Sequence, residues 1–425
     1  MVPSDAPPDR SWRCAREPRL PHAATGSLQW GSAMRVAIVH YWLVSMRGGE
    51  KVIESLCDLY PEADIFTLVY DQGRVSDTIK KHKVTSSFLQ RIPGAIGHYQ
   101  SLLPLMPFAL ESLDLSGYDL IISSESGPAK GIIPPPHAAH ICYCHSPMRY
   151  LWDHYHAYRS SAGLLSRVMM PVLAPMLRTW DVNTSMRVDR FVANSHHVAA
   201  RISKYYRRPA TVIYPPVSTE DFAPSIQIED FYLCAGQIVP YKRIDLAVEA
   251  FTKMGRNLVV IGDGKEQDIA RLKRMAGPTV TFLGRAPFAV LKEKLARCRA
   301  LVFPGEEDFG IVPVEAMASG RPVIAFGAGG ALETVVPNLT GLLFEQQSVD
   351  ALIKAIYAFE AREDAFRPDV IRAHTGQFSV RKFKAGMQAV IDDELRQRRA
   401  LPFGDGKLAI GGYQMREAEG ATPLH

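Results

Sequence analysis

Two carboxylates eight positions apart, Glu307 and Glu315, flank a junction where a strand-like run, Leu301–Phe303, is followed by a helical pattern. Pro313 suits the first turn of that helix, because a residue in this turn has no use for its N–H. Unpaired amides at a helix start attract anions, and carboxylates accept hydrogen bonds from hydroxyls. The pattern therefore predicts a ligand that carries both phosphate and hydroxyl groups. The amides that would face the phosphate belong to Phe309, Gly310 and Ile311.

Basic residues follow another strand of the same predicted sheet. Lys242 and Arg243 come after Tyr232–Ala235, and the carboxyl ends of parallel strands meet at the edge where open α/β sheets bind ligands. Two cations and a helix start can therefore converge on a diphosphate. An isolated pair of glutamates would more simply be solvated acids at a helix start, but the neighbouring cations favour a ligand site. The next loop, available to a nucleoside, contains Gly262, Asp263 and Gly264.

Two series of short apolar runs, alternating with helical patterns such as Glu50–Leu59, must position these residues. The alternation predicts an α/β chain of two doubly wound domains. Prolines at 209, 215, 216 and 224 indicate a linker over about 209–228. The expected strands are Arg35–Trp42, Ile65–Tyr70, Leu120–Ser123, Ala139–Cys144, Arg190–Ala193, Tyr232–Ala235, Leu258–Ile261, Thr279–Leu283, Leu301–Phe303, Val323–Ala325 and Leu342–Phe344.

Length and composition limit the class of protein. The 425 residues suffice for two or three domains, and 47% hydrophobic with 22% charged residues is the globular average. A net charge of +5 is too small to indicate nucleic-acid binding. The apolar stretches fall short of the ~20 residues of a membrane-spanning helix, and six scattered cysteines favour a reduced compartment without disulfides. The abrupt change of composition at Met34 makes this residue a candidate start of translation, so that the preceding segment is either a disordered tail or a stretch that is not translated.

Together these motifs resemble the GT-B glycosyltransferases of glycosyltransferase family 4, from about Met34 to Gln397. Within the family, the chain most resembles bacterial mannosyltransferases of O-antigen and exopolysaccharide assembly, through Val-His-Tyr-Trp-Leu at 39–43 and Pro-Tyr-Lys-Arg-Ile-Asp at 240–245. The resemblance implies two doubly wound Rossmann-like domains that face a cleft. The matching residues are Gly48 and Gly49, His145 in His-Ser-Pro, Lys242, the loop Gly262-Asp263-Gly264, and the pair Glu307 and Glu315.

The resemblance implies how the second domain would hold a nucleotide sugar. Glu315 would bind the ribose hydroxyls and Glu307 the hydroxyls of the donor sugar. Lys242 and the amides of 309–311 would bind the diphosphate. The residues expected to act at the reacting centre are His145, Lys242 and Glu307.

The first domain would complete the donor site. The loop with Gly48 and Gly49 would close over the donor phosphates, and His145 would lie beside the donor sugar and orient it. One position departs from the family pattern, because many members have arginine where this chain has Gln237. Arg243 is the expected replacement for that missing charge.

The implied function is that of a retaining glycosyltransferase. It would move a hexose, expected to be mannose from GDP-mannose, to a lipid-linked or polysaccharide-precursor acceptor. Cations and amides aimed at the departing diphosphate would stabilise its charge, so no metal or other cofactor is expected. Two alternatives stay open: a sugar-nucleotide epimerase on the same fold, and a sugar-nucleotide-binding protein without activity. A Rossmann dehydrogenase is disfavoured because no Gly-x-Gly-x-x-Gly follows the first strand.

The family pattern divides the chain into five parts. We expect a disordered extension over 1–33, an acceptor-side domain over 34–215, a nucleotide-sugar-binding domain over 216–378, a helix over 379–400 that can cross to the first domain, and a flexible tail over 401–425.

A dense group of imidazoles and thiols raises a zinc alternative. We disfavour it because Ala139–Cys144 has a strand pattern, which turns Cys142 and Cys144 to one face as small core residues. The group consists of His137, His140, Cys142, Cys144 and His145.

Between Arg149 and Arg208, ten basic residues accompany three acidic ones and are interleaved with the apolar run Val168–Leu177. The pattern predicts either a face that rests on an anionic membrane or solvated helices with a buried stripe. We expect a cytoplasmic protein, which under the first alternative would be peripheral on the inner face of the cytoplasmic membrane. The candidate acceptor contacts in this segment are Arg149, Tyr150 and Asp153.

Overall fold

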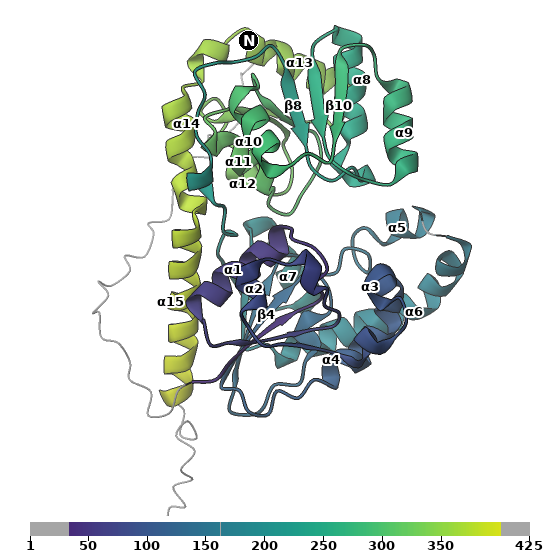
Figure 1. The fold of residues 1–425 in the computed structure, drawn as a ribbon, viewed down its shortest axis with the longest axis vertical. Helices are drawn as coiled ribbons and strands as arrows, with labels where there is room; N and C mark the ends of the chain where they lie inside the picture. The colour runs from purple at the N-terminus through teal and green to yellow at the C-terminus, as the bar shows by residue number, and fades with distance from the viewer. Residues whose placement is uncertain (1–33, 162, 401–425) are drawn as a thin grey trace, which may run out of the picture. The chain divides into compact units, whose positions relative to one another are not determined.

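Two parallel β-sheets, one after the other along the chain, organise the protein (Figure 1). The computed structural model describes residues 34–161 and 163–400, and from Arg35 onward these residues belong to one compact unit. We call the residues of the first sheet and its helices the first half and those of the second sheet the second half. The extension predicted over 1–33 and the tail predicted over 401–425 lie outside the described residues.

The first sheet has seven strands in the order β3-β2-β1-β4-β5-β6-β7, and every neighbouring pair is parallel. Its central strands β1, β4 and β5 are buried along their whole length because helices cover both faces of a doubly wound sheet. The strands are β1 (Val36–His40), β2 (Asp64–Thr67), β3 (Val84–Ser86), β4 (Leu120–Glu125), β5 (Ala139–Cys144), β6 (Arg190–Ala193) and β7 (Ala210–Val212).

The second sheet has six strands in the order β10-β9-β8-β11-β12-β13, again all parallel. In both sheets the order reverses beside the first strand of the half, at β1 and at β8, which is where open α/β sheets bind ligands. The strands are β8 (Tyr232–Ala235), β9 (Leu258–Ile261), β10 (Val280–Gly284), β11 (Leu301–Phe303), β12 (Val323–Phe326) and β13 (Gly341–Phe344).

Helices connect the parallel strands, as a crossover between parallel neighbours requires. The first half has α1 (Gly48–Leu59), α2 (Asp77–Lys80), α3 (Ala95–His98), α4 (Met106–Glu111), α5 (Tyr155–Ser161), α6 (Leu164–Thr184) and α7 (His196–Tyr206). The helices that follow β8 along the chain are α8 (Ile244–Met254), α9 (Glu266–Met275), α10 (Phe288–Arg297), α11 (Ile311–Ala318), α12 (Ala331–Thr334), α13 (Val349–Glu360), α14 (Pro368–His374) and α15 (Val380–Ala400).

The predicted architecture of two doubly wound α/β domains is confirmed, and β5, β6, β8, β9 and β11 have the predicted bounds. Sequence patterns missed the two edge strands of the first sheet. Neither β3 nor β7 is buried as the inner strands are, so neither has the continuous apolar run that marks a parallel strand. The linker predicted over 209–228 is therefore too long, because β7 lies within it. The domain limits at 215/216 and 378/379 stay predictions.

The chain passes between the halves twice, and the two passages are paired. Val217, after β7, forms a parallel bridge with Ser379, and its N–H donates to the carbonyl of Phe378 over 3.0 Å. After Ser379 the chain continues as α15, the long yellow helix of Figure 1, which lies against the first half. Lys384 of α15 pairs with Asp58 at 2.7 Å, and the ring of Phe383 meets that of Tyr143 with centroids 5.4 Å apart.

None of the helices in the described part of the chain combines the length and the apolar character needed to cross a lipid bilayer. The described cysteines are all buried free thiols, at positions 57, 142, 144, 234 and 298.

A fully buried charge cluster lies at the carboxyl end of β4. Lys130 pairs with Glu125 at 2.9 Å and contacts Asp181 of α6, and all three side chains are inaccessible to solvent. Trp152 and Tyr206 donate hydrogen bonds to Asp181 at 2.8 and 3.1 Å. Burial alone would lower the pKa of Lys130, but the two carboxylates raise it above its usual value, so the lysine stays charged. The cluster joins β4, α6 and the segment that follows β5.

We predict that Lys130→Met destabilises the first half by ~3–5 kcal/mol, because two carboxylates stay buried without their cation. Urea unfolding followed by tryptophan fluorescence measures it, since the described tryptophans, at 42, 152 and 180, all lie in the first half. Lys80→Met is the matched control, because it removes a lysine from a solvent-exposed pair with Asp77 and should change stability by less than about 0.5 kcal/mol. Equal effects of the two substitutions would contradict the prediction.

Candidate functional site

The loop after β11 turns into α11 through a glycine. Gly310 precedes the helix with φ of 84°, a backbone conformation that side chains with a Cβ rarely adopt. The N–H groups at the start of α11 therefore point out of the helix, unpaired within it and at its positive end. This is the helix start predicted from the sequence, with Pro313 in the first turn.

Lys242 and Glu307 meet beside this helix start. Lys242 ends a 3₁₀ turn (Pro240–Lys242) after β8, Glu307 lies in the loop after β11, and the ammonium Nζ is 2.7 Å from the carboxylate Oε1. Only 15% and 20% of the two side chains are exposed. Burial alone would lower the pKa of Lys242, but the attraction of Glu307 prevails and raises it. The pair is a cation and an anion that neutralise each other at the carboxyl edge of the second sheet.

Glu315 lies one turn into α11, on the side of the helix toward the first half. Burial raises the pKa of its carboxyl to about 7, against a smaller opposite influence from Lys51 on α1. The two halves also touch nearby, since a Cβ on Gly48 would lie 2.8 Å from Cδ1 of Ile311. A glycine at 48 thus lets the start of α1 approach the start of α11.

The loops after β8 and β9 lie together. Ile238 and Gly264 form a parallel bridge, and the Gly264 N–H donates to the Asp263 carboxylate over 2.8 Å. Gln237 is next to Ile238, and its side-chain oxygen accepts from Arg47 of the first half over 3.4 Å. Arg243 points elsewhere: it pairs with Asp245 at 3.3 Å and donates to Gln347 over 3.1 Å. The expectation that Arg243 joins Lys242 on a diphosphate stays a prediction, and the cation that contacts Gln237 in this structure is Arg47.

His145 follows β5 at the carboxyl edge of the first sheet. Its Nε2 is 2.8 Å from the Ser124 hydroxyl, and its backbone N–H donates to the Glu125 carbonyl over 2.6 Å. Burial lowers the pKa of the imidazole to about 4, although the negative charge of Asp308 acts in the opposite direction. His145 is therefore neutral near pH 7, and its orientation is fixed by hydrogen bonds within the first half.

The three candidate acceptor contacts already have partners in the protein. Arg149 pairs with Asp308 at 2.6 Å, Asp153 pairs with Arg201 at 2.6 Å, and the Tyr150 hydroxyl donates to the sulfur of Met148 over 2.9 Å. Their acceptor role stays a prediction.

Sequence reasoning missed Asp308 and Arg201, which also pair with each other at 2.8 Å. Asp308 directly follows Glu307 in the loop before α11, so its position in the sequence was evident. Nothing in the sequence signalled that its partners would come from the other half of the chain.

The imidazoles and thiols of β5 and its flanking residues lie in different surroundings. Cys142 and Cys144 pack in the core with Val188 and Phe191, and the His140 ring is hydrogen-bonded to Ser123 and to the carbonyl of Arg187. Among residues 34–161 and 163–400, no group of three or more histidine, cysteine or acidic side chains is placed to hold a metal ion.

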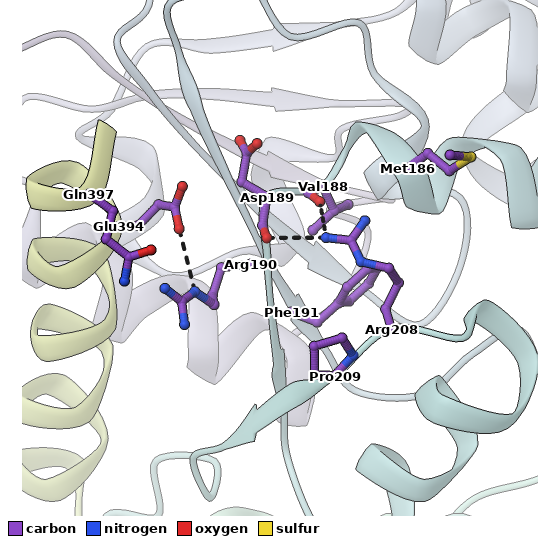
Figure 2. Close-up of a pocket in the computed structure, with 9 residues that line it drawn as sticks. All are labelled: Met186, Val188, Asp189, Arg190, Phe191, Arg208, Pro209, Glu394 and Gln397. Carbon is purple, nitrogen blue, oxygen red and sulfur yellow. Dashed lines mark hydrogen bonds and ion pairs between the residues drawn. The ribbon is translucent and has the colours of Figure 1, made fainter. Parts of the chain in front are cut away.

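A separate pocket lies at the opposite edge of the first sheet (Figure 2). Arg190 is the first residue of β6, so this pocket opens at the amino end of the strands, whereas His145 follows a carboxyl end. Its arginines are occupied: Arg190 pairs with Glu394 at 3.4 Å, and Arg208 donates to the carbonyls of Val188 and Asp189 (Figure 2). We therefore do not assign the pocket to the candidate site.

The site can stabilise a leaving anion. An ammonium and the outward N–H groups of a helix start act together on negative charge, and shielding from water strengthens both. The carboxylates Glu307 and Glu315 add acceptors for hydroxyls on either side. These groups suit a nucleoside diphosphate attached to a sugar.

Comparisons with known proteins agree with this architecture. Residues 46–221 match the family model described as Glycosyltransferase Family 4, and residues 219–375 match the model described as Glycosyl transferases group 1. The two matched segments follow one another and cover most of the chain. The chain therefore belongs to the GT-B glycosyltransferases that combine these two halves, as its motifs predicted.

Individual relatives are similar over part of their length. A GDP-mannose-dependent alpha-mannosyltransferase of Mycobacterium tuberculosis is 37% identical over 138 residues, 30% of this chain and 36% of that protein. A GDP-mannose-dependent alpha-(1-6)-phosphatidylinositol monomannoside mannosyltransferase of the same species is 30% identical over 218 residues, 44% of this chain and 56% of that protein. The matches thus span about half or less of these relatives.

Solved structures share the fold. The Anabaena protein HepE, in complex with UDP-glucose, superposes with a TM-score of 0.62 over 84% of this chain and 99% of that one, at 16% identity.

We predict that Glu315→Gln is stabilising at pH 8 and nearly neutral at pH 5. A carboxyl whose pKa is about 7 when folded and 4.5 otherwise binds more protons in the folded state, so stability falls as the pH rises from about 4.5 to 7. The loss amounts to at most about 3 kcal/mol, and glutamine avoids it. Thermal unfolding at both pH values measures it, with Glu249→Gln, in an exposed pair on α8, as control. A difference between wild type and Glu315→Gln that does not change with pH would contradict the prediction.

Proposed function

We propose that the protein is a retaining mannosyltransferase that moves mannose from GDP-mannose to a lipid-linked glycan acceptor. The observation that carries the proposal is the pairing of Lys242 with Glu307 beside the start of α11. Lys242 would turn from Glu307 to the diphosphate when the donor binds. Glu307 would then be free to accept hydrogen bonds from the sugar, and Glu315 from the ribose.

The relatives support the choice of donor. Both curated relatives described above are named as GDP-mannose-dependent mannosyltransferases, and one acts on a phosphatidylinositol mannoside. The similarity to the first covers 30% of this chain, so the specificity is proposed by analogy. UDP-glucose, the ligand of the HepE structure, is the competing donor that an experiment must compare.

The mechanism follows from the charges of the site. Breaking the bond between sugar and phosphate leaves positive charge on the sugar ring and negative charge on the diphosphate, which Lys242 and the amides of 309–311 would stabilise. In the proposed step the acceptor oxygen attacks the anomeric carbon from the side that the diphosphate leaves, and a phosphate oxygen takes the acceptor proton. His145, neutral and held by Ser124, would orient the sugar. No metal is needed in this scheme.

An apolar stripe on α6 suits a lipid-linked acceptor. Val168, Val172 and Met176 recur every four residues, so they share one face of the helix, and 62%, 62% and 66% of their surfaces are exposed. Phe108 of the neighbouring α4 is 67% exposed, and α4 and α6 are joined by a 3.2 Å hydrogen bond from Trp180 to Glu111. Helices α5 and α6 also contain Arg159, Arg167 and Arg178. We propose that this face rests on an anionic membrane.

We predict that GDP-mannose is turned over in preference to UDP-glucose, and that Lys242→Ala or Glu315→Ala lowers turnover at least about tenfold, or ~1.4 kcal/mol in the barrier. Nucleotide release from each donor measures turnover. Lys253→Ala, at an exposed site on α8, is the control and should keep wild-type turnover.

Near-normal turnover in both Lys242→Ala and Glu315→Ala would refute the site, and preference for UDP-glucose would refute the donor. NMR of the product would refute retention if the anomeric configuration were inverted.

We predict that the protein floats with liposomes that contain phosphatidylglycerol and not with pure phosphatidylcholine. Val172→Glu should lower the bound fraction at least about tenfold, because burial of a valine is worth roughly 1.5–3 kcal/mol and the new charge repels the surface. Leu339→Glu, at an exposed apolar position of the second half, is the matched control. Equal binding of both variants would show that α6 does not face the membrane.

A further inference from the structure

Asp308 follows Glu307 directly and is held by two arginines of the first half. Arg149 Nη2 lies 2.6 Å and Arg201 Nη1 2.8 Å from Oδ1 of Asp308. Arg149 belongs to the segment after β5 and Arg201 to α7, so one carboxylate of the second half binds two separate elements of the first. The proposed donor site gives no role to Asp308 or to Arg201.

This ion-pair group is largely shielded from solvent and its charges are matched. The exposed fractions are 16% for Asp308, 15% for Arg149 and 9% for Arg201. Burial alone would raise the pKa of Asp308, but the two guanidinium groups hold it below its usual value. Arg201 also donates to the Ser146 hydroxyl over 2.5 Å and pairs with Asp153. Charge-assisted bonds of this kind are strong, and loss of one partner leaves a buried charge.

The backbone transmits the position of Asp308 to Glu307. The Gly330 N–H donates to the Glu307 carbonyl over 2.8 Å. On the other side, the Phe309 ring is buried and meets the rings of Tyr214 and Phe378, each with centroids 5.6 Å apart. Glu307 and Asp308 therefore project from one short loop between these two contacts, and we expect a displacement of one carboxylate to displace the other.

The same ion pairs bind the segment that carries His145. Arg149 lies four positions after His145, and Asp308 is close enough to influence the His145 pKa. We propose that Asp308, Arg149 and Arg201 are positioning residues that hold Glu307 opposite His145. This inference rests on the proposed function, because Glu307 and His145 act on the donor sugar only there.

A second contact between the halves provides the control. Glu333 of α12 accepts hydrogen bonds from the backbone N–H groups of His196 and His197, over 2.8 and 2.9 Å, at the start of α7. Glu333 joins α7, the helix of Arg201, to the second half. This contact is made through α12 and not through the side chains of Glu307 and Asp308. Glu333→Gln should therefore weaken the contact between the halves and leave the Glu307 loop in place.

Hydrogen–deuterium exchange of the free protein tests the positioning role without any donor. Arg201→Gln and Arg149→Gln should each speed exchange of the amides over 306–308 by about tenfold or more. Glu333→Gln should speed exchange at His196 and His197 only. Wild-type exchange over 306–308 in both arginine variants would overturn the proposal, and so would equal exchange there in Glu333→Gln.

Turnover tests the consequence for chemistry. Asp308→Asn and Arg201→Gln should lower kcat for GDP-mannose hydrolysis about tenfold, while the Kd for GDP stays within about twofold, because Glu307 is proposed to contact the donor sugar and not the GDP. Arg201→Lys should restore part of kcat. A loss of GDP affinity in parallel with kcat would indicate misfolding of the site and overturn the positioning role. Arg149→Gln, which keeps the Arg201 pair, replaces Asp308→Asn if that variant does not fold.

The two proposals fail separately. A wild-type protein that neither binds GDP nor hydrolyses GDP-mannose refutes the proposed function, and the exchange measurement still decides whether Asp308 positions the loop.

Discussion

The ion pair between Lys242 and Glu307 is the interaction around which the candidate site of the second half is arranged. The two residues lie on loops after β8 and β11, so they meet only because neighbouring parallel strands end at one sheet edge. Neither charge is well solvated, and each is stable there because the other is present. In the proposed donor complex a diphosphate takes the place of the Glu307 carboxylate beside the ammonium. In the free protein the Lys242 ammonium is therefore already at the site, with its charge compensated by Glu307.

The first half contributes shape and orientation more than charge. Gly48 allows α1 to reach the start of α11, and His145 is kept neutral by burial and fixed by Ser124. Because Ser124 occupies Nε2, the neutral imidazole has only Nδ1 left for a ligand, as donor or acceptor according to the tautomer. The charges that do cross between the halves, those of Arg149 and Arg201, end on Asp308. In the proposed mechanism the second half therefore stabilises the leaving group, and the first half fixes the geometry.

The fold was predictable from the sequence to a large extent, because apolar runs buried on both faces mark the inner strands of a parallel sheet. The edge strands β3 and β7 lack such runs and were missed. The loop of Glu307 was also predictable, since its motif is local. Asp308 and Arg201 were not, because they are 107 positions apart and each has a simple reading as a surface charge. Arg149 and Asp153 were expected to face an acceptor for the same reason: their charges are visible in the sequence and their partners are not.

The pairing of the two chain passages at Val217 and Ser379 limits how the halves can move. Two connections without contact between them would allow the halves to slide as well as rotate. Because the two connections are hydrogen-bonded to each other at Val217 and Ser379, we expect them to act as a single pivot. We therefore expect any separation of the halves to be a rotation about this point, with a displacement that grows with distance from it. The pivot lies beside Phe378, whose ring touches Phe309 next to the start of α11. A rotation that separates the halves widely at the end far from the pivot would admit an incoming molecule there. The same rotation would move the start of α11, which lies near the pivot, much less.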